Sequence, residues 1–261
     1  IFTLNFILSR GIIFFFPLFF ANIFNSENYI IFEQVIAIGN LFVPIATLGF
    51  FTMLPKIIKT SEIEFGYKFI KVHLYFIIIL LLFFSLIFHE YTIVFLSLII
   101  SSFMIISRFF STSDKINKNR NRALFFETSI YLFFGFFVFV LNFETIKSIS
   151  YFMIFVPVLY LMLNFLQINK VNLKKYFLKY NWVLFLKSST PNLFSGFLLI
   201  LFFQILKVVT PIYFDSNQSY IFLYVFRFSF IVFISYQLLS FYFFSDIVSN
   251  KFEIRNKKIF Y

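Results

Sequence analysis

The chain has 261 residues, of which 61% are hydrophobic and only 13% are charged. This composition excludes a water-soluble globular domain, because no soluble core hides so much apolar surface, and it places the chain in the membrane class. Cysteine is absent, which excludes disulfide bonds, thiolate nucleophiles and cysteine-based metal sites.

Eight apolar stretches meet or approach the roughly 20 residues that a helix needs to cross a hydrocarbon core about 30 Å thick. All eight should be helices, because lipid offers the backbone hydrogen-bonding groups no partner outside their own chain. We therefore expect an all-α integral membrane protein with about eight transmembrane helices. In chain order, the predicted spans are residues 4–24, 30–54, 72–88, 92–110, 123–141, 149–167, 192–213 and 220–245.

Basic residues are distributed unevenly among the connectors. The connectors after the second, fourth, sixth and eighth spans hold 17 Lys and Arg residues, whereas the alternate connectors hold only Lys147. Because cells retain Lys and Arg on the cytoplasmic side, the pattern predicts a multi-pass protein of the bacterial inner membrane with its amino terminus in the cytoplasm. The net charge of +11 then needs no nucleic-acid partner, and we expect attraction to anionic membrane lipids instead.

Two cations lie inside predicted spans at similar depth. Lys207 is six residues before the end of the seventh span and Arg227 is seven residues after the start of the eighth. Each is therefore about 9 to 11 Å below the outer surface, at 1.5 Å per residue. One interpretation is that both face a water-filled cavity and bind an anionic group. The alternative is that each side chain extends along its own stem to the outer interface.

Polar and small residues follow one face of the second span. They are Glu33, Ala37, Asn40, Pro44 and Thr47, at spacings of four, three, four and three. One interpretation is that this face packs tightly against a neighbouring helix through its small residues. The other is that it lines a cavity, with Glu33 as the counter-charge to the two cations.

The remaining polar residues of the spans lie close to predicted boundaries. Arg10 is near the cytoplasmic edge, as an interfacial anchor or a ligand for an anion, and Arg108 and Glu127 are interpreted as boundary residues. His73 and His89 have no partners at metal-ligand spacing, and no hydrolase, phosphate-loop or metalloprotease motif is present. We therefore expect no metal, no cofactor and no enzymatic activity.

Several short stretches of the chain form a recognisable pattern. They are Ser9-Arg10-Gly11, Asn22, Asn28-Tyr29, Leu48-Gly49, Leu54-Pro55-Lys56-Ile57-Ile58, and the segment from Tyr220 through Arg227 and Gln237 to Asp246. These stretches resemble polysaccharide-export flippases of the Wzx type, which belong to the multidrug/oligosaccharidyl-lipid/polysaccharide exporter superfamily. Two features depart from the family pattern, because Ile30 stands where Gly commonly follows Tyr and because family members usually have twelve or more spans.

The resemblance implies two bundles of about six helices around a central cavity that opens alternately to either side. Residues 1–169 would form the first lobe, 170–191 a cytoplasmic connector, and 192–261 the first two helices of a second, truncated lobe. We expect the chain to be a fragment, because it begins at Ile1 rather than Met and lacks the family's remaining spans.

The implied substrate is a polyprenyl-diphosphate-linked oligosaccharide, the repeat unit of an O-antigen of lipopolysaccharide or of a capsule. Arg and Lys in a wet cavity replace part of the hydration of the diphosphate through charge-assisted hydrogen bonds. The expected substrate-binding residues are Arg227, Lys207 and Arg10, with Glu33 and Asn40 as counter-charge or coupling residues. Other membrane proteins of glycan assembly are expected partners.

Three other functions remain open. A membrane enzyme of glycan assembly, either a polymerase or a polyprenyl-dependent glycosyltransferase, usually needs a substantial outward loop, and the outward loops here are short. A proton-pumping subunit of a respiratory complex would carry a central chain of alternating Lys and Glu residues, which is not found. A multidrug exporter of the same superfamily would share the fold.

Overall fold

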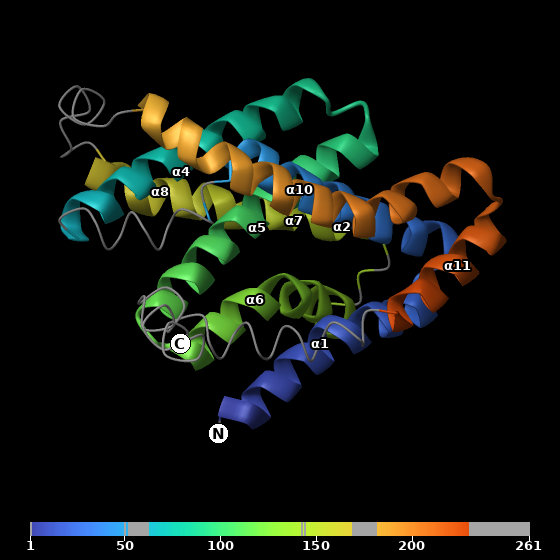
Figure 1. Cartoon of the computed structure of the whole chain (residues 1–261). Coiled ribbons are helices and arrows are strands. Elements are labelled where there is room, and N and C mark those ends of the chain that lie inside the picture. The colour runs from blue at the N-terminus through green and yellow to red at the C-terminus, as the bar shows by residue number, and fades with distance from the viewer. Residues whose placement is uncertain are drawn as a thin grey trace, which may run out of the picture.

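All regular secondary structure in the computed structural model is helical over the residues that the structure describes, which are 2–49, 51, 63–141, 143, 145–168 and 182–229. The expected all-α class is therefore confirmed for this part of the chain (Figure 1). In chain order the helices are α1 (Phe2–Ile23), α2 (Ser26–Ala46), α4 (Ile63–Ile87), α5 (Thr92–Ile116), α6 (Arg120–Gly135), the π-helix η1 (Phe136–Val140), α7 (Ile146–Met153), α8 (Phe155–Ile168), α10 (Trp182–Tyr213) and α11 (Ser216–Phe228).

Among the described residues, five helical stretches are long and apolar enough to cross a membrane. Two shorter apolar stretches, Lys71–Ile87 and Ile200–Tyr213, overlap the predicted third and seventh spans. The eighth span is represented by α11, and its residues 230–245 lie outside the described residues. Large apolar side chains stay exposed on outward faces of α4 and α8, where lipid would cover them, for example Leu80, Phe83, Leu86, Leu159 and Met162. The chain is a multi-pass membrane protein.

The second predicted span is shorter in the structure, because α2 ends at Ala46 rather than continuing to residue 54. Leu48 and Gly49 adopt positive φ angles of 49° and 68°. A Cβ atom on Gly49 would lie 3.0 Å from the Cβ of Leu193 in α10. Glycine therefore permits both the left-handed turn and the close approach of α10.

Two predicted spans are interrupted helices. The sixth is divided between α7 and α8, because Pro157 has no N–H to donate to the carbonyl of Met153, where α7 ends. The fifth continues from α6 into the π-helix η1, directly after Gly135. Gly135 lies against α1 so closely that an added Cβ would be 2.4 Å from the ring of Phe16.

The seventh span begins earlier than its apolar run. α10 starts at Trp182, ten residues before the predicted start at Asn192, and continues to Tyr213. The last part of the predicted connector 170–191 is therefore helical, and residues 170–181 lie outside the described residues.

Helix α2 is central to the packing. It packs against α5 on one side and against α10 and α11 on another, while α6 packs against α1 and α5. Phe32 of α2 makes edge-to-face contacts with Phe20 and Phe134, at ring-centroid distances of 5.4 and 5.1 Å. The helix begins at a well-formed cap, in which Asn25 accepts a hydrogen bond from the Asn28 amide at 2.8 Å. This packing fixes where the polar face of α2 points.

Candidate functional site

Glu33 of α2 lies between the two predicted intramembrane cations. Its Oε2 is 2.7 Å from Lys207 Nζ of α10, and its Oε1 is 2.6 Å from Nε and 2.5 Å from Nη2 of Arg227 of α11. The hydroxyl of Tyr29, one turn earlier, donates to Oε1 at 3.2 Å. The side chains of Glu33, Lys207 and Arg227 are only 0%, 4% and 7% exposed. These three residues form a buried charged triad.

The charged triad joins three helices and settles how the two cations are oriented. The Lys207 ammonium points at Glu33 inside the bundle, so the interpretation in which Lys207 extends to the outer interface does not describe this structure. Two cations share one carboxylate, which leaves the triad with a net charge of +1. Buried charges are tolerated where they are paired and hydrogen-bonded in this way.

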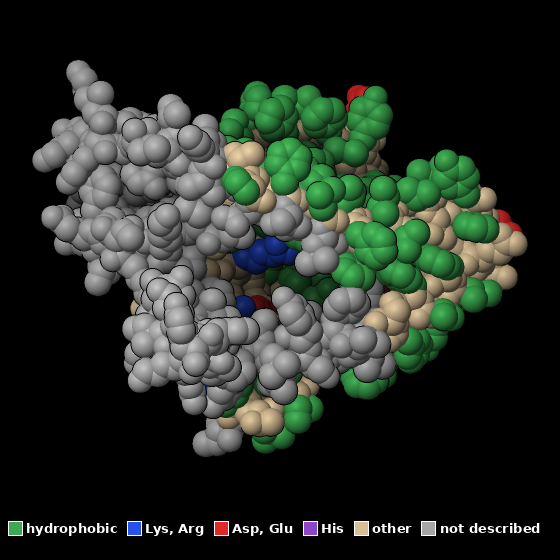
Figure 2. Space-filling model, viewed as in Figure 1, with side chains coloured by type: hydrophobic (Ala, Val, Ile, Leu, Met, Phe, Trp, Pro, Cys, Tyr) green, Lys and Arg blue, Asp and Glu red, His purple; other side chains and the backbone are tan. Residues whose placement is uncertain are grey.

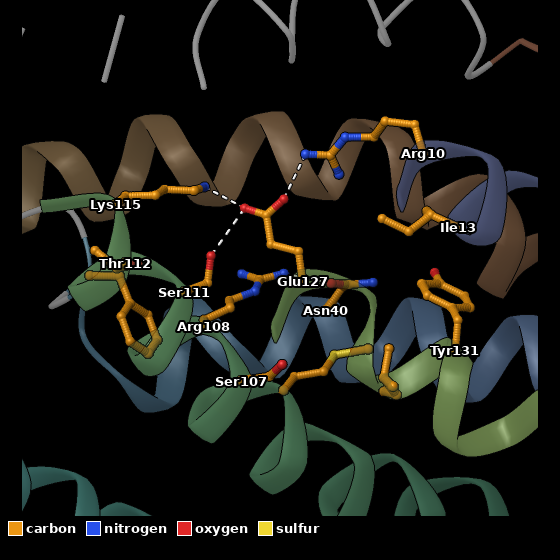
Figure 3. A pocket seen from close by; sticks show the side chains of 13 residues that line it. Arg10, Ile13, Asn40, Ser107, Arg108, Ser111, Thr112, Lys115, Glu127 and Tyr131 are labelled. Carbon is orange, nitrogen blue, oxygen red and sulfur yellow. Dashed lines mark hydrogen bonds and ion pairs between the residues drawn. The ribbon is translucent and has the colours of Figure 1, made fainter. Parts of the chain in front are cut away.

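A separate cavity of about 470 Å³ lies among α1, α2, α5 and α6. This volume is within the range of small-molecule binding sites. Figure 2 shows a hollow in one face of the molecule with basic and acidic side chains inside it, and Figure 3 shows the cavity lining from close by. Its polar lining residues are Arg10 of α1, Asn40 of α2, Ser107, Arg108, Ser111, Thr112 and Lys115 of α5, and Glu127 and Tyr131 of α6.

Glu127 is the acidic centre of the cavity wall. Its Oε2 accepts from Arg10 Nη2 at 2.6 Å, and its Oε1 pairs with Lys115 Nζ (Figure 3). The Ser111 hydroxyl donates to the same Oε1 at 3.2 Å. Both carboxylate oxygens are therefore engaged, and Arg10 and Lys115 each share the charge of Glu127.

Arg108 is held differently. Its Nη2 donates to Asn40 Oδ1 at 2.6 Å, and Asn40 Nδ2 donates to the Ile36 carbonyl at 3.0 Å. Within the described part of the chain, Arg108 forms no ion pair with a carboxylate. Among the residues that the structure describes, the charged lining comprises three cations and one anion, a net charge of +2. Such a cavity inside a low-dielectric bundle attracts anions.

Two of the five predicted site residues line the cavity, namely Arg10 and Asn40, and the other three form the charged triad. Lys207 and Arg227 do not line it. Among the described residues, no group of three or more His, Asp or Glu side chains is placed to hold a metal ion.

Sequence reasoning missed Arg108, Lys115 and Glu127 as cavity residues. The predicted fourth span ended at residue 110, whereas α5 continues to Ile116. Arg108 and Ser111 are three residues apart and Ser111 and Lys115 four, which is the spacing of one helix face. That pattern was a usable signal once the helix was extended beyond its apolar run.

The cavity and the triad share α2. Glu33 and Asn40 are seven residues apart, which is about 10.5 Å along the helix and nearly the same face. The two charged clusters are therefore neighbours along one axis.

Comparison with protein-family models, with curated proteins and with solved structures found no match. The resemblance to Wzx-type flippases therefore rests on the sequence stretches quoted above.

Proposed function

We propose that the protein is a flippase that moves a polyprenyl-diphosphate-linked oligosaccharide, such as an O-antigen or capsule repeat unit, from the cytoplasmic to the outer face of the bacterial inner membrane. The observation that carries the proposal is the cavity of about 470 Å³ inside an apolar helical bundle, whose described lining holds three cations against one carboxylate. A diphosphate that enters the bilayer loses hydration, and Arg and Lys replace part of it through charge-assisted hydrogen bonds.

The position of the cavity supports entry from the cytoplasm. Arg10 lies in the first half of α1, and Lys115 is one residue from the end of α5. The distribution of basic residues predicts that this end of both helices faces the cytoplasm. The buried charged triad lies farther toward the opposite end of α2, where it holds α10 and α11 on that helix. In an alternating-access cycle, these contacts would have to open for release on the outer side.

A multidrug exporter of the same superfamily is the second candidate. It would share the all-α bundle and a central cavity, so the fold does not separate the two functions. The net charge of the lining favours an anionic cargo over the cationic compounds that many such exporters would carry.

The proposal is tested in cells that make the glycan, with the gene deleted and then restored at full length. We expect polyprenyl-diphosphate-linked oligosaccharide to accumulate on the cytoplasmic side after deletion and to return to its normal level after restoration. A gene carrying Arg10→Gln together with Arg108→Gln should fail to restore export at normal membrane abundance. A gene carrying Lys147→Gln, an exposed basic residue outside the cavity, should restore it.

Unchanged surface glycan without accumulation of lipid-linked units would remove the proposed substrate. Export of a small molecule would then be the better assignment for the same cavity.

A further inference from the structure

The three cavity cations differ in what balances their charge. Arg10 and Lys115 both pair with the carboxylate of Glu127. Arg108 instead donates to the neutral side-chain oxygen of Asn40, at 2.6 Å. An amide oxygen fixes the position of a guanidinium without cancelling its charge, whereas a carboxylate does both. Among the described residues of the cavity, Arg108 is therefore the cation that forms no ion pair with a carboxylate.

Asn40 is itself held in one orientation. Its Nδ2 donates to the carbonyl of Ile36, one turn earlier on α2, at 3.0 Å. This bond uses the amide nitrogen on the backbone and turns Oδ1 toward Arg108, which lies on α5. A side chain that only filled space between α2 and α5 would need neither bond.

We propose that Arg108 is the main receptor for a diphosphate group in the cavity and that Asn40 is its positioning residue, which orients the guanidinium and leaves its charge free. Arg108 uses Nη2 on Asn40, and a guanidinium has further N–H groups in a fork that matches two phosphate oxygens. Arg10 and Lys115 stand beside it as secondary cations. The inference deepens the proposed function, because it names the receptor within the same cavity, and binding alone tests it.

The experiment is a calorimetric titration of the full-length protein, in nanodiscs of neutral phosphatidylcholine, with inorganic pyrophosphate. Four variants are compared with the unmodified protein: Asn40→Asp, Asn40→Leu, Arg108→Gln and Asn121→Asp. Asn40→Asp keeps the size of the side chain but gives Arg108 a carboxylate partner. Asn121 is exposed and lines no part of the cavity, so Asn121→Asp adds the same charge elsewhere.

We expect Asn40→Asp to weaken pyrophosphate binding by at least about tenfold, the loss of one charge-assisted hydrogen bond. Its thermal unfolding midpoint should stay close to that of the unmodified protein, because the new ion pair with Arg108 offsets the lost hydrogen bond to the Ile36 carbonyl. Arg108→Gln should weaken binding to a similar degree. Asn40→Leu should lose less affinity, because the cation is kept and only its orientation is lost. Asn121→Asp should bind normally.

Unchanged binding by a folded Asn40→Asp variant would overturn the assignment of Arg108 as the receptor. A loss in Asn40→Leu as large as in Asn40→Asp would reduce Asn40 to a structural residue. Neither result depends on transport, so accumulation of lipid-linked units in deleted cells is a separate outcome, and each proposal can fail while the other stands.

A parallel titration with farnesyl diphosphate separates the two sources of a diphosphate. Tighter binding of farnesyl diphosphate than of pyrophosphate supports a lipid-linked group. Equal binding contradicts the lipid-linked source and supports a free diphosphate on the same receptor.

Discussion

Glu33 contributes more to the charge balance of the bundle than either of its partners. It is fully buried and accepts from Lys207, Arg227 and Tyr29. Removing its charge leaves two buried cations facing each other, whereas removing the charge of Lys207 leaves a neutral pair of Glu33 and Arg227. The three members of the charged triad are therefore not equivalent.

This inequality gives a prediction for stability. Glu33→Gln should lower the free energy of unfolding by about 3–5 kcal/mol, the usual cost of breaking a buried ion pair from one side. Lys207→Met should cost less, and the double variant should regain part of the loss of Glu33→Gln, because only one cation then remains. Thermal unfolding in detergent measures all three. Equal losses in the two single variants, with no recovery in the double variant, would contradict this account.

At the residue scale, sequence reasoning succeeded where charges lie deep in apolar runs and failed near helix ends. Lys207, Arg227 and Glu33 interrupt long apolar stretches, so their burial and the role of Glu33 as a counter-charge were accessible hypotheses. Arg108 and Glu127 lie where hydropathy falls, although α5 and α6 continue past them. The distance of a residue from the end of an apolar run therefore underestimates its distance from the end of the helix. The partnership of Arg108 with Asn40 depends on tertiary packing, which no spacing reveals.

At the scale of the helices, Gly135 of α6 lies directly against the Phe16 ring of α1. The Cβ of an alanine at position 135 would lie 2.4 Å from Phe16 Cε2 and 2.9 Å from Cδ2, and the π-helix η1 begins directly afterwards. Gly11 on α1 is the opposite case, because the nearest atom to an added Cβ, on Phe15, is 3.9 Å away.

Gly135→Ala should therefore destabilise the protein by about 1–3 kcal/mol, the typical cost of overpacking, because the Phe16 ring must move. Gly11→Ala serves as the matched control and should be neutral or slightly stabilising, since alanine is the better helix former. Adding Phe16→Leu should relieve part of the cost at position 135. Unfolding midpoints of the four proteins provide the comparison, and a neutral Gly135→Ala variant would show that the Phe16 ring moves at little cost.

Helix ends and interruptions were only partly predictable. Pro157 is a visible reason for the break between α7 and α8, and Gly49 for the end of α2. The early start of α10 at Trp182 was hidden, because a polar stretch and Pro191 separate its first apolar residues, 182–186, from the long apolar run. A window chosen to find membrane spans detects the apolar part of a helix and not the helix itself.

For the whole molecule, the distribution of basic residues makes a prediction about sidedness. The chain contains no cysteine, so a single introduced cysteine is the one thiol of this chain that a maleimide can label. Asn121 and Asn217 are both exposed and lie in connectors predicted to be on opposite sides of the membrane. A membrane-impermeant maleimide should label Asn217→Cys in intact spheroplasts and Asn121→Cys only after the membrane is opened. Labelling in the reverse order would place the amino terminus outside and the cavity at the outer face.

Glu33 and Asn40 lie two turns apart on nearly the same face of helix α2. Rotation of α2 about its own axis would move both side chains away from their cationic partners in a single movement. Lys207 and Arg227 would lose their carboxylate at the moment Arg108 lost its amide oxygen. Cations at two depths would thus lose their partners on α2 together. An anionic cargo that leaves the cation at one depth would then meet cations at the other depth that no longer have their partner on α2.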